Sequence, residues 1–462
     1  MEGNDKRPWC APGVEDAGPR CFGGGDDGAG GAVAGRARDR ELDIGTTIRL
    51  TFLALGSRGD VQPYVALGSA LAGCGYRVRI ATFESFREMV ARRGLDFHPV
   101  PGDAQAVFQV TAQALPAGTR NPFRMMRAIM RGYGALVDDY IRAFSSEDLF
   151  DSDAILNQLP GGLFGGDLAE RLGIPYLTLS VIPLVPTRAF PLPLLASRSL
   201  GGPLNLLSYA FAERMLWVIF RPRIREFRRI LGLGDPPRRF PRPGGPIVNG
   251  FSTHVVPPPP DWPGDVHVTG YWTLPEPDWE PPGALVRFIE AGDPPVFLGF
   301  GSMIPPDPGG LMETLLEAVQ MAEVRAVIGR GWAGFGKSSL PDNVFAVDYA
   351  PYDWLFPRMA AVVHHGGSGT TGLALQGGVP SMVVSFAADQ DYWGERTRAL
   401  GCGPAPISIR RLTAGRLAEA LERLVTEPAL RERAQALGGR LREEDGLGSG
   451  VRVVRGYLDT IG

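Results

Sequence analysis

The chain has 462 residues, 44% of them hydrophobic, and a formal net charge of −3 at pH 7. This length exceeds what one hydrophobic core usually holds, so we expect a globular protein of two domains. The small net charge gives no electrostatic reason to bind nucleic acid, or an anionic membrane through overall charge alone. Four cysteines without CxxC spacing and five scattered histidines do not indicate a disulfide scaffold or a zinc site. A cytoplasmic protein without a metal is therefore the expectation.

The first 45 residues are rich in Gly, Asp and Arg and lack the apolar run of a signal peptide. Their composition predicts a disordered tail. No uninterrupted apolar run further along reaches the ~18 residues of a membrane span, and prolines interrupt the stretch from Thr178 to Leu195.

The first ordered segment alternates apolar runs with helical patterns. A strand is predicted over Ile48–Leu55, then a turn, a helix starting near Val61 and a strand over Tyr76–Thr82. Two later apolar runs extend the same pattern, at Ala154–Leu156 and Pro175–Ser180. This order predicts a parallel, doubly wound sheet, and we assign residues 46–245 to the first domain.

Pro/Gly-rich segments interrupt the middle of the chain and predict an interdomain linker region at residues 246–283. The strand pattern then resumes, so residues 284–445 are expected to form a second doubly wound α/β domain. Residues 446–462 carry a final helical pattern, Gly450 to Leu458, which we expect to pack back on the first domain.

The most informative segment of the second domain reads HHGGSGTT, from His364 to Thr371. A short apolar strand precedes it, glycines turn the chain, and Ser368 opens a helix. Unpaired backbone N–H groups and the helix dipole at such a turn suit a phosphate or pyrophosphate. No Lys or carboxylate pair accompanies the turn, which argues against a magnesium-dependent Walker-type site. A plain Gly-rich connection capped by Ser and Thr is the alternative.

The next predicted strand, Pro380–Ser385, leads to Asp389 and Gln390. Ligands of open α/β sheets lie beyond the carboxyl ends of the strands, so this loop and the HHGGSGTT turn are expected to face one crevice. A carboxylate beside an amide can bind sugar hydroxyls, although an Asp-Gln pair is also an ordinary helix cap.

The stretch from Tyr349 to Gly403 resembles the donor-binding signature of the UDP-glycosyltransferase family. Within that family it most resembles the sterol 3-beta-glucosyltransferases and bacterial natural-product glycosyltransferases. Further segments carry the resemblance, so that it covers residues 48 to about 440: GSRGDVQP at 56–63, PTRAFP at 186–191, DW at 261–262, GYW at 270–272 and GFGSM at 299–303. The resemblance implies the GT-B fold, in which two Rossmann-like lobes face a central cleft.

On this basis the second domain binds the nucleotide sugar. His365 is expected to contact the pyrophosphate, and Asp389 with Gln390 to hold the 3- and 4-hydroxyls of a sugar, usually glucose in this family. Aromatic and backbone groups from Tyr349 onward would recognise the uracil ring. The remaining residues expected at the phosphates are Gly301, Ser302, Gly367, Ser368, Gly369 and Thr370.

Asp60, just after the first strand, is the candidate general base for removing the proton of an acceptor hydroxyl. Its position also suits a helix cap, which would lower its pKa and weaken it as a base. The resemblance favours the catalytic interpretation, since related bacterial enzymes place a catalytic Asp in this motif. One departure from the sterol-type pattern is Phe83, where many relatives have His.

The acceptor is expected in the first domain, over residues 105–140 and 181–220, with Phe83, Arg188 and Trp217 as candidate contacts. Their Met-rich and aromatic stretches fit either a core-facing helix or a lid that faces lipid at a membrane periphery. No obligate protein partner is indicated.

The resemblance implies an inverting, metal-independent transfer of a hexose from UDP-glucose to a hydrophobic sterol, lipid or polyketide-like acceptor. Two alternatives stay open: a tailoring enzyme that uses a dTDP-sugar, and a non-catalytic auxiliary protein of the same fold. A UDP-sugar 2-epimerase shares the fold but would need additional carboxylates and His in the cleft.

Overall fold

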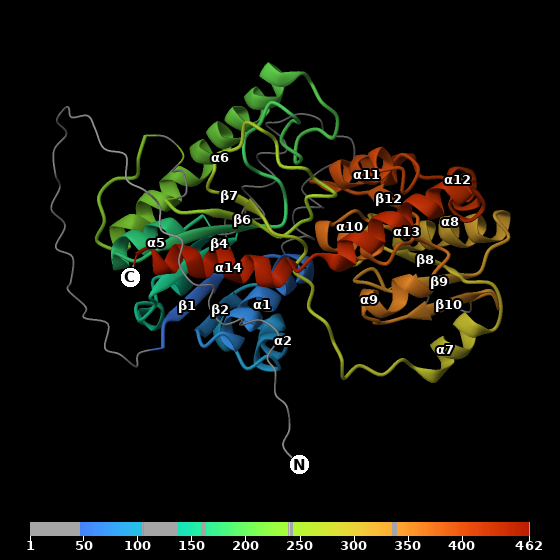
Figure 1. Cartoon of the computed structure of the whole chain (residues 1–462), viewed down its shortest axis with the longest axis horizontal. Helices are drawn as coiled ribbons and strands as arrows, with labels where there is room; N and C mark the ends of the chain where they lie inside the picture. The colour runs from blue at the N-terminus through green and yellow to red at the C-terminus, as the bar shows by residue number, and fades with distance from the viewer. Residues whose placement is uncertain are drawn as a thin grey trace, which may run out of the picture.

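The computed structural model describes residues 47–103, 105, 137–158, 163–238, 240, 244–334 and 340–461. The predicted tail therefore lies outside the described residues, as does most of the predicted acceptor stretch at 105–140. The described chain forms two lobes side by side, which the linker and the last helix connect (Figure 1).

The first lobe contains a parallel sheet of seven strands in the order β3-β2-β1-β4-β5-β6-β7. The central strands β1, β4 and β5 are buried along almost their whole length, as expected for strands with helices on both faces. The strands are β1 (Arg49–Leu53), β2 (Arg77–Phe83), β3 (Asp96–Val100), β4 (Ala154–Gln158), β5 (Tyr176–Ser180), β6 (Ile247–Asn249) and β7 (Val266–Val268). The described helices of this lobe are α1 (Arg58–Gly73), α2 (Arg87–Ala91), α5 (Gly165–Leu172) and α6 (Gly202–Ile230).

The second lobe contains a parallel sheet of six strands in the order β10-β9-β8-β11-β12-β13. Its strands are β8 (Val296–Gly299), β9 (Ala326–Gly329), β10 (Val344–Val347), β11 (Ala361–His364), β12 (Ser381–Ser385) and β13 (Ile407–Ser408). Its helices are α7 (Gly283–Glu290), α8 (Pro308–Met321), α9 (Tyr352–Leu355), α10 (Ser368–Gln376), α11 (Gln390–Ala399), α12 (Ala414–Thr426) and α13 (Pro428–Glu443). The two sheets with their covering helices confirm the predicted pair of doubly wound α/β domains.

The domain boundary differs from the one predicted from composition. Strands β6 and β7 fall inside the segment 246–283, yet they pair with β5 and with each other as the edge of the first sheet. Each has only three residues, and the prolines around them obscured the strand pattern. The first lobe therefore continues to Val268, and the chain crosses to the second lobe between there and α7.

The last helix, α14 (Gly446–Asp459), crosses from the second lobe and lies along the first (Figure 1). Its residues Val451, Val454 and Leu458 are buried in the same hydrophobic cluster as the strands of the first sheet. Gly446 allows the crossing, because a Cβ at this position would lie 2.4 Å from the carbonyl oxygen of Tyr271. The helix thus ties the second lobe to the core of the first.

Among the described residues, no helix is both long and apolar enough to span a bilayer.

Candidate functional site

One large cavity of about 2500 Å³ lies between the lobes, and both contribute to its lining. Single-ligand pockets are usually about 300–1,000 Å³, so this volume is sufficient for two substrates together. The loops at the carboxyl ends of β1, β5, β8, β11 and β12 reach it, as the topology of open α/β sheets requires.

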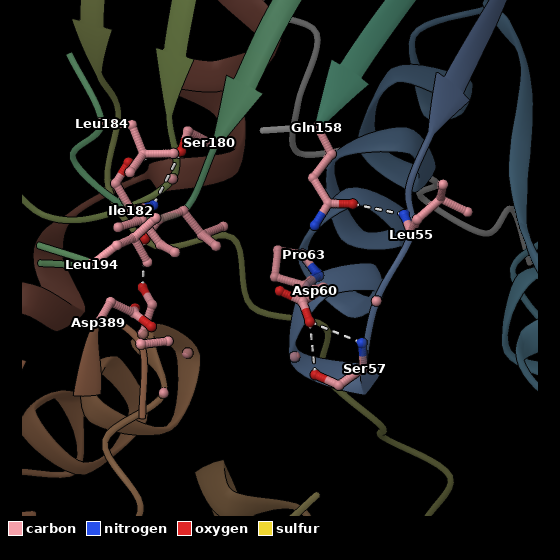
Figure 2. A pocket seen from close by; sticks show the side chains of 18 of the residues that line it. Leu55, Ser57, Asp60, Pro63, Gln158, Ser180, Ile182, Leu184, Leu194 and Asp389 are labelled. Atoms are coloured by element: carbon pink, nitrogen blue, oxygen red, sulfur yellow. Dashed lines mark hydrogen bonds between the residues drawn. The ribbon is translucent and has the colours of Figure 1, made fainter. Parts of the chain in front are cut away.

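Asp60 lies in the first turn of α1, at the first-lobe wall of the cavity (Figure 2). Its oxygen Oδ2 accepts hydrogen bonds from the backbone N–H and the hydroxyl of Ser57, both at 2.8 Å. Gly56 permits this arrangement, since its φ is +135° and an added Cβ would lie 2.5 Å from Oδ2. The N-cap of α1 is therefore Ser57 and not Asp60, which the alternative interpretation expected; Asp60, at the third helical position, completes the capping box through one of its two oxygens.

The electrostatic consequence differs from that of an ordinary cap. Burial raises the pKa of Asp60 above its usual value, and this effect exceeds the lowering by the two hydrogen bonds from Ser57. A capping carboxylate with a raised pKa is a stronger base than a solvated one. Capping and proton abstraction are therefore compatible at this position.

The second-lobe wall carries the N-terminus of α10, a nine-residue helix. Its first intrahelical hydrogen bond runs from the N–H of Thr371 to the carbonyl of Gly367. The N–H groups of Ser368, Gly369 and Thr370 precede that bond, and all three residues line the cavity. The hydroxyl of Ser368, however, donates to the carbonyl of Val181 in the first lobe at 2.6 Å. In this arrangement Ser368 offers a phosphate its backbone N–H, while its hydroxyl joins the lobes.

His365 and Gly301 come together at the same wall. A Cβ on Gly301 would lie 3.3 Å from Cε1 of His365, so the loops after β8 and β11 touch. Burial lowers the pKa of His365 to about 4, so the ring is neutral at physiological pH. Its Nδ1 has no hydrogen-bond partner among the described residues. Gly367 and Ser302 also line the cavity beside it.

The adjacent His364 has a different environment. It is fully buried at the end of β11, where its Nδ1 accepts a hydrogen bond from the N–H of Gly366 at 3.1 Å. It is absent from the cavity lining. It thus shapes the turn from inside the sheet.

Asp389 precedes α11 and reaches the cavity from the wall opposite Asp60 (Figure 2). Its Oδ2 accepts a hydrogen bond from Nε1 of Trp393 at 2.6 Å. Burial raises the pKa of Asp389 to about 6, and the negative charge of Asp60 contributes to the rise. Trp393 is itself fully buried, so it orients the carboxylate rather than lining the cavity.

Gln390 lines the cavity, but part of its side chain has other partners. Its Oε1 accepts from the N–H groups of Phe386 and Ala387, at 2.6 and 3.1 Å, and its amide nitrogen points at the sulfur of Met303, 3.2 Å away. Only the amide nitrogen of Gln390 is left to donate a hydrogen bond to a sugar hydroxyl. The predicted pairing of Asp389 with Gln390 on a sugar stays a prediction.

Tyr349 participates in a network that the sequence analysis did not find. The guanidinium of Arg58 donates to the Tyr349 hydroxyl and to Glu276, each at 2.9 Å, and its Cζ lies 4.7 Å from the centre of the Tyr349 ring. Tyr349 also donates to Glu276. All three residues line the cavity, so the network joins the first lobe, the linker and the second lobe at its edge. Arg58 lies in the GSRGDVQP motif, but nothing in the motif indicates partners more than 200 residues away.

The first-lobe side of the cavity is a chamber lined mainly by apolar and aromatic side chains, although the ion-paired Asp167, Glu170 and Arg228 also belong to it. Phe83, at the end of β2, is 1% exposed and packs against Tyr140 with ring centres 6.1 Å apart. It is a core residue whose surface also lines the cavity. Figure 2 shows Ile182, Leu184 and Leu194 on the same side. Other members of this lining are Val137, Leu163, Phe164, Leu192, Phe211, Met215, Leu216, Ile219 and Phe220.

The structure does not bring two other predicted acceptor contacts to the cavity. Arg188 is exposed, and its backbone N–H donates to Asp261 at 2.7 Å, which holds the segment against the connection between β6 and β7. Trp217 is 2% exposed within the first lobe, where its Nε1 donates to the carbonyl of Arg238 at 3.2 Å. Both belong to segments that brace the lobe, and neither is among the lining residues. The prediction that Arg188 and Trp217 contact the acceptor is therefore wrong, and both residues have structural roles.

Among the described residues, no group of three or more His, Cys, Asp or Glu side chains could hold a metal ion.

Two doubly wound lobes share one cavity, with a helix N-terminus and a neutral His on one side and an apolar chamber on the other. These features define a glycosyltransferase of the GT-B class. Two family models match: the glycosyltransferase family 28 N-terminal domain at residues 50–191, and the erythromycin biosynthesis protein CIII-like C-terminal domain at residues 314–445.

A sterol 3-beta-glucosyltransferase of Arabidopsis thaliana is 35% identical over 429 residues, which cover 89% of this chain and 68% of that protein. Another, of Neosartorya fischeri, is 34% identical over 88% of this chain. The match spans only 29% of that fungal protein's length.

Solved structures share the fold at lower identity. The calicheamicin glycosyltransferase CalG4 superposes with a TM-score of 0.65 at 21% identity, covering 90% of this chain and 99% of its own. The glycosyltransferase VinC, solved in complex with dTDP, gives 0.60 at 20% identity, covering 88% and 99%. The chain belongs to the UDP-glycosyltransferase family, in the branch that includes the sterol 3-beta-glucosyltransferases.

Proposed function

We propose that this protein is an inverting glycosyltransferase that moves a hexose, glucose in our assignment, from UDP-glucose to a hydroxyl of a hydrophobic acceptor. The observation that carries the proposal is the division of the cavity between the lobes into two chemically distinct halves. The second lobe presents helix N–H groups and His365, while the first lobe presents apolar side chains and Asp60. A nucleotide sugar is polar and charged, which matches the second-lobe half. A lipid-like alcohol is mostly apolar, which matches the first-lobe half.

In the proposed reaction the acceptor hydroxyl approaches Asp60 from the apolar chamber. Its oxygen attacks the anomeric carbon of the sugar as the Asp60 carboxylate takes the hydroxyl proton. The bond between that carbon and the UDP oxygen breaks, and UDP leaves with the electron pair. Attack from the face opposite the leaving group converts an α-linked donor into a β-glycoside.

The leaving UDP acquires negative charge at its phosphate oxygens. The N–H groups of Ser368, Gly369 and Thr370 lie at the positive end of the α10 dipole, where they would stabilise that charge. His365 is neutral and would contribute one N–H donor. Gly301 and Ser302 would approach the same phosphates from the loop after β8.

The sugar would lie between the two walls, with Asp389 accepting hydrogen bonds from its hydroxyls and the amide of Gln390 donating one. Sterol-type relatives with glucosyltransferase names support glucose as the sugar and a lipid alcohol as the acceptor. Tyr349 would flank the uracil ring.

A specific observation favours a second candidate, a tailoring enzyme of antibiotic type that uses a dTDP-deoxysugar. The family model that matches residues 314–445 carries the name of an erythromycin biosynthesis protein, and Oε1 of Gln390 is already occupied by the loop before it. A sugar with fewer hydroxyls would need fewer partners at this wall.

The test is to incubate the purified protein with UDP-glucose or dTDP-glucose and a panel of sterols and polyketide aglycones, and to measure the mass gain of one hexose. Transfer from UDP-glucose to sterols, lost in Asp60→Asn, is the expected result, with a β-linkage by NMR. Transfer only from dTDP-sugars or only to polyketides would replace it with the second candidate. Donor binding in calorimetry without transfer to any acceptor would indicate an auxiliary protein.

A further inference from the structure

Helix α6 exposes a row of large apolar side chains to solvent. Leu204, Leu207, Phe211 and Val218 are 54%, 59%, 45% and 59% exposed. Their spacing of three, four and seven residues puts them on one face of the helix. We call this row the α6 apolar face.

The α6 apolar face is additional to the face by which the helix joins its own lobe. Tyr209, Phe220, Ile224 and Phe227 are buried on the opposite side of the helix. A helix at the surface of a soluble domain usually carries polar residues on its outer face. Leu195 and Leu200, 43% and 49% exposed in the segment before the helix, enlarge the patch. An apolar patch of this kind indicates an interaction surface.

The second half of the same helix is strongly basic. The helix contains six arginines and two glutamates, and every arginine follows Glu213. Arg214, Arg225 and Arg229 are exposed and lie on the same side as the α6 apolar face, and of these Arg225 pairs with Asp235 at 3.1 Å. Apolar side chains followed by cations along one outer face match a lipid surface with anionic headgroups better than a neutral protein partner.

The α6 apolar face also continues into the cavity. Leu195, Ala210 and Phe211 are exposed at the surface and at the same time belong to the cavity lining. The apolar lining continues from these three residues to Leu206, Met215 and Leu216. The exposed patch and the chamber assigned to the acceptor are thus one continuous apolar surface.

We propose that the α6 apolar face docks on an anionic lipid bilayer, with its N-terminal half in the interface and its arginines toward the headgroups. The chamber would then open on the bilayer, so that a lipid alcohol reaches Asp60 without crossing water. The delivery of acceptor rests on the proposed function, whereas the docking itself does not.

The experiment is flotation of the full chain with phosphatidylcholine vesicles that contain or lack phosphatidylglycerol. The test variant is Leu204→Gln with Leu207→Gln, because neither side chain lines the cavity. Met321→Gln, in which the replaced side chain is 52% exposed at the end of α8 in the other lobe, is the matched control (Figure 1). Calorimetric melting of all three proteins confirms that they are folded.

The wild type and the control should bind the anionic vesicles, and the double variant at least about tenfold more weakly, since two leucines leave the interface. Binding should also weaken with salt and without phosphatidylglycerol. Absence of wild-type binding to anionic vesicles, or equal binding by the double variant, would overturn the proposal. So would light scattering that shows the double variant converting a dimer to a monomer with vesicle binding unchanged.

Transfer assays on the same samples separate this proposal from the proposed function. A wild type that binds vesicles but glycosylates no acceptor would retain the docking and refute the function. A protein that glycosylates a detergent-dispersed sterol but ignores vesicles would do the reverse.

Discussion

Asp389 and Asp60 face each other from opposite lobes of the cleft, and the charge of Asp60 adds to the burial that raises the pKa of Asp389 to about 6 (Figure 2). Neither carboxylate forms an ion pair with a described residue. Like charges therefore face each other across the cleft whenever both carboxylates are ionised. A sugar that donates hydroxyl hydrogens to Asp389 would offset part of this repulsion.

Stability should therefore fall as the pH rises. The folded state binds the Asp389 proton more tightly than the unfolded state, whose Asp has a pKa near 3.8. Between about pH 4 and 6 the folded state holds more protons, so raising the pH through this range destabilises it. Asp389→Asn removes the effect and should stabilise the protein at pH 7.5 by on the order of 1–3 kcal/mol, with little difference near pH 4.

Calorimetric melting at several pH values measures this difference. Asp391→Asn is the control, because Asp391 is exposed in the first turn of the same helix. A gain in Asp389→Asn that persists unchanged at pH 4 would show that burial of the charge is not its cause.

The hydrogen bonds from Ser57 should set how far the pKa of Asp60, the proposed base, is raised. They lower the pKa of Asp60 against the larger effect of burial, so Ser57→Ala should raise it further by removing the hydroxyl donor. The acid limb of the kcat/KM profile should move to higher pH, while the plateau rate stays within a few fold. Asp60→Asn keeps the size of the side chain and should lower kcat by roughly 10²–10⁴ at every pH. An unchanged acid limb in Ser57→Ala would mean that another group titrates.

The sequence predicted those parts of the molecule that depend on local pattern. Apolar runs gave both sheets, and the glycines around His365 gave the strand-to-helix turn that presents α10 to the cavity. Short strands such as β6 and β7, with three residues each among prolines, fall below what periodicity can detect.

Contacts between distant segments could not be predicted. The hydrogen bond from Ser368 to Val181 joins residues 187 positions apart, and Arg58 reaches Tyr349 across 291. Such pairs depend on how the lobes are placed, which no local pattern encodes. Trp217 shows the converse error, since its amphipathic stretch predicted only that one face is buried, and not which residues would turn toward the cavity.

The neutral state of His365 gives a third prediction. Its lowered pKa, about 4, means that it does not change charge between pH 6 and 8, so donor affinity should not follow a histidine titration in that range. His365→Ala removes an N–H donor to phosphate and should weaken UDP binding by roughly ten- to a hundredfold. His365→Asn, which keeps a donor, should recover part of that loss. Calorimetry with UDP measures both, and a drop in affinity between pH 6 and 7 that occurs in the wild type but not in His365→Ala would contradict the neutral ring.

Two glycines at opposite ends of α1 allow backbone strain to be separated from the position of the base. Gly56 and Gly75 both have positive φ, +135° and +96°, so alanine at either is strained by on the order of 1–2 kcal/mol. Only at Gly56 does the added Cβ meet the Asp60 carboxylate, at 2.5 Å, whereas at Gly75 nothing lies within 4 Å.

Gly56→Ala should therefore lower the melting temperature more than Gly75→Ala, because its added Cβ also meets the Asp60 side chain, and only Gly56→Ala should lose activity. The expected loss in kcat is at least about 10²-fold, because displacing a catalytic group by 1 Å can have that effect. KM for the donor should change little in either variant, since the phosphate-binding groups lie on the other lobe. Equal activity in the two variants would show that the contact between Gly56 and Asp60 does not determine where the base lies.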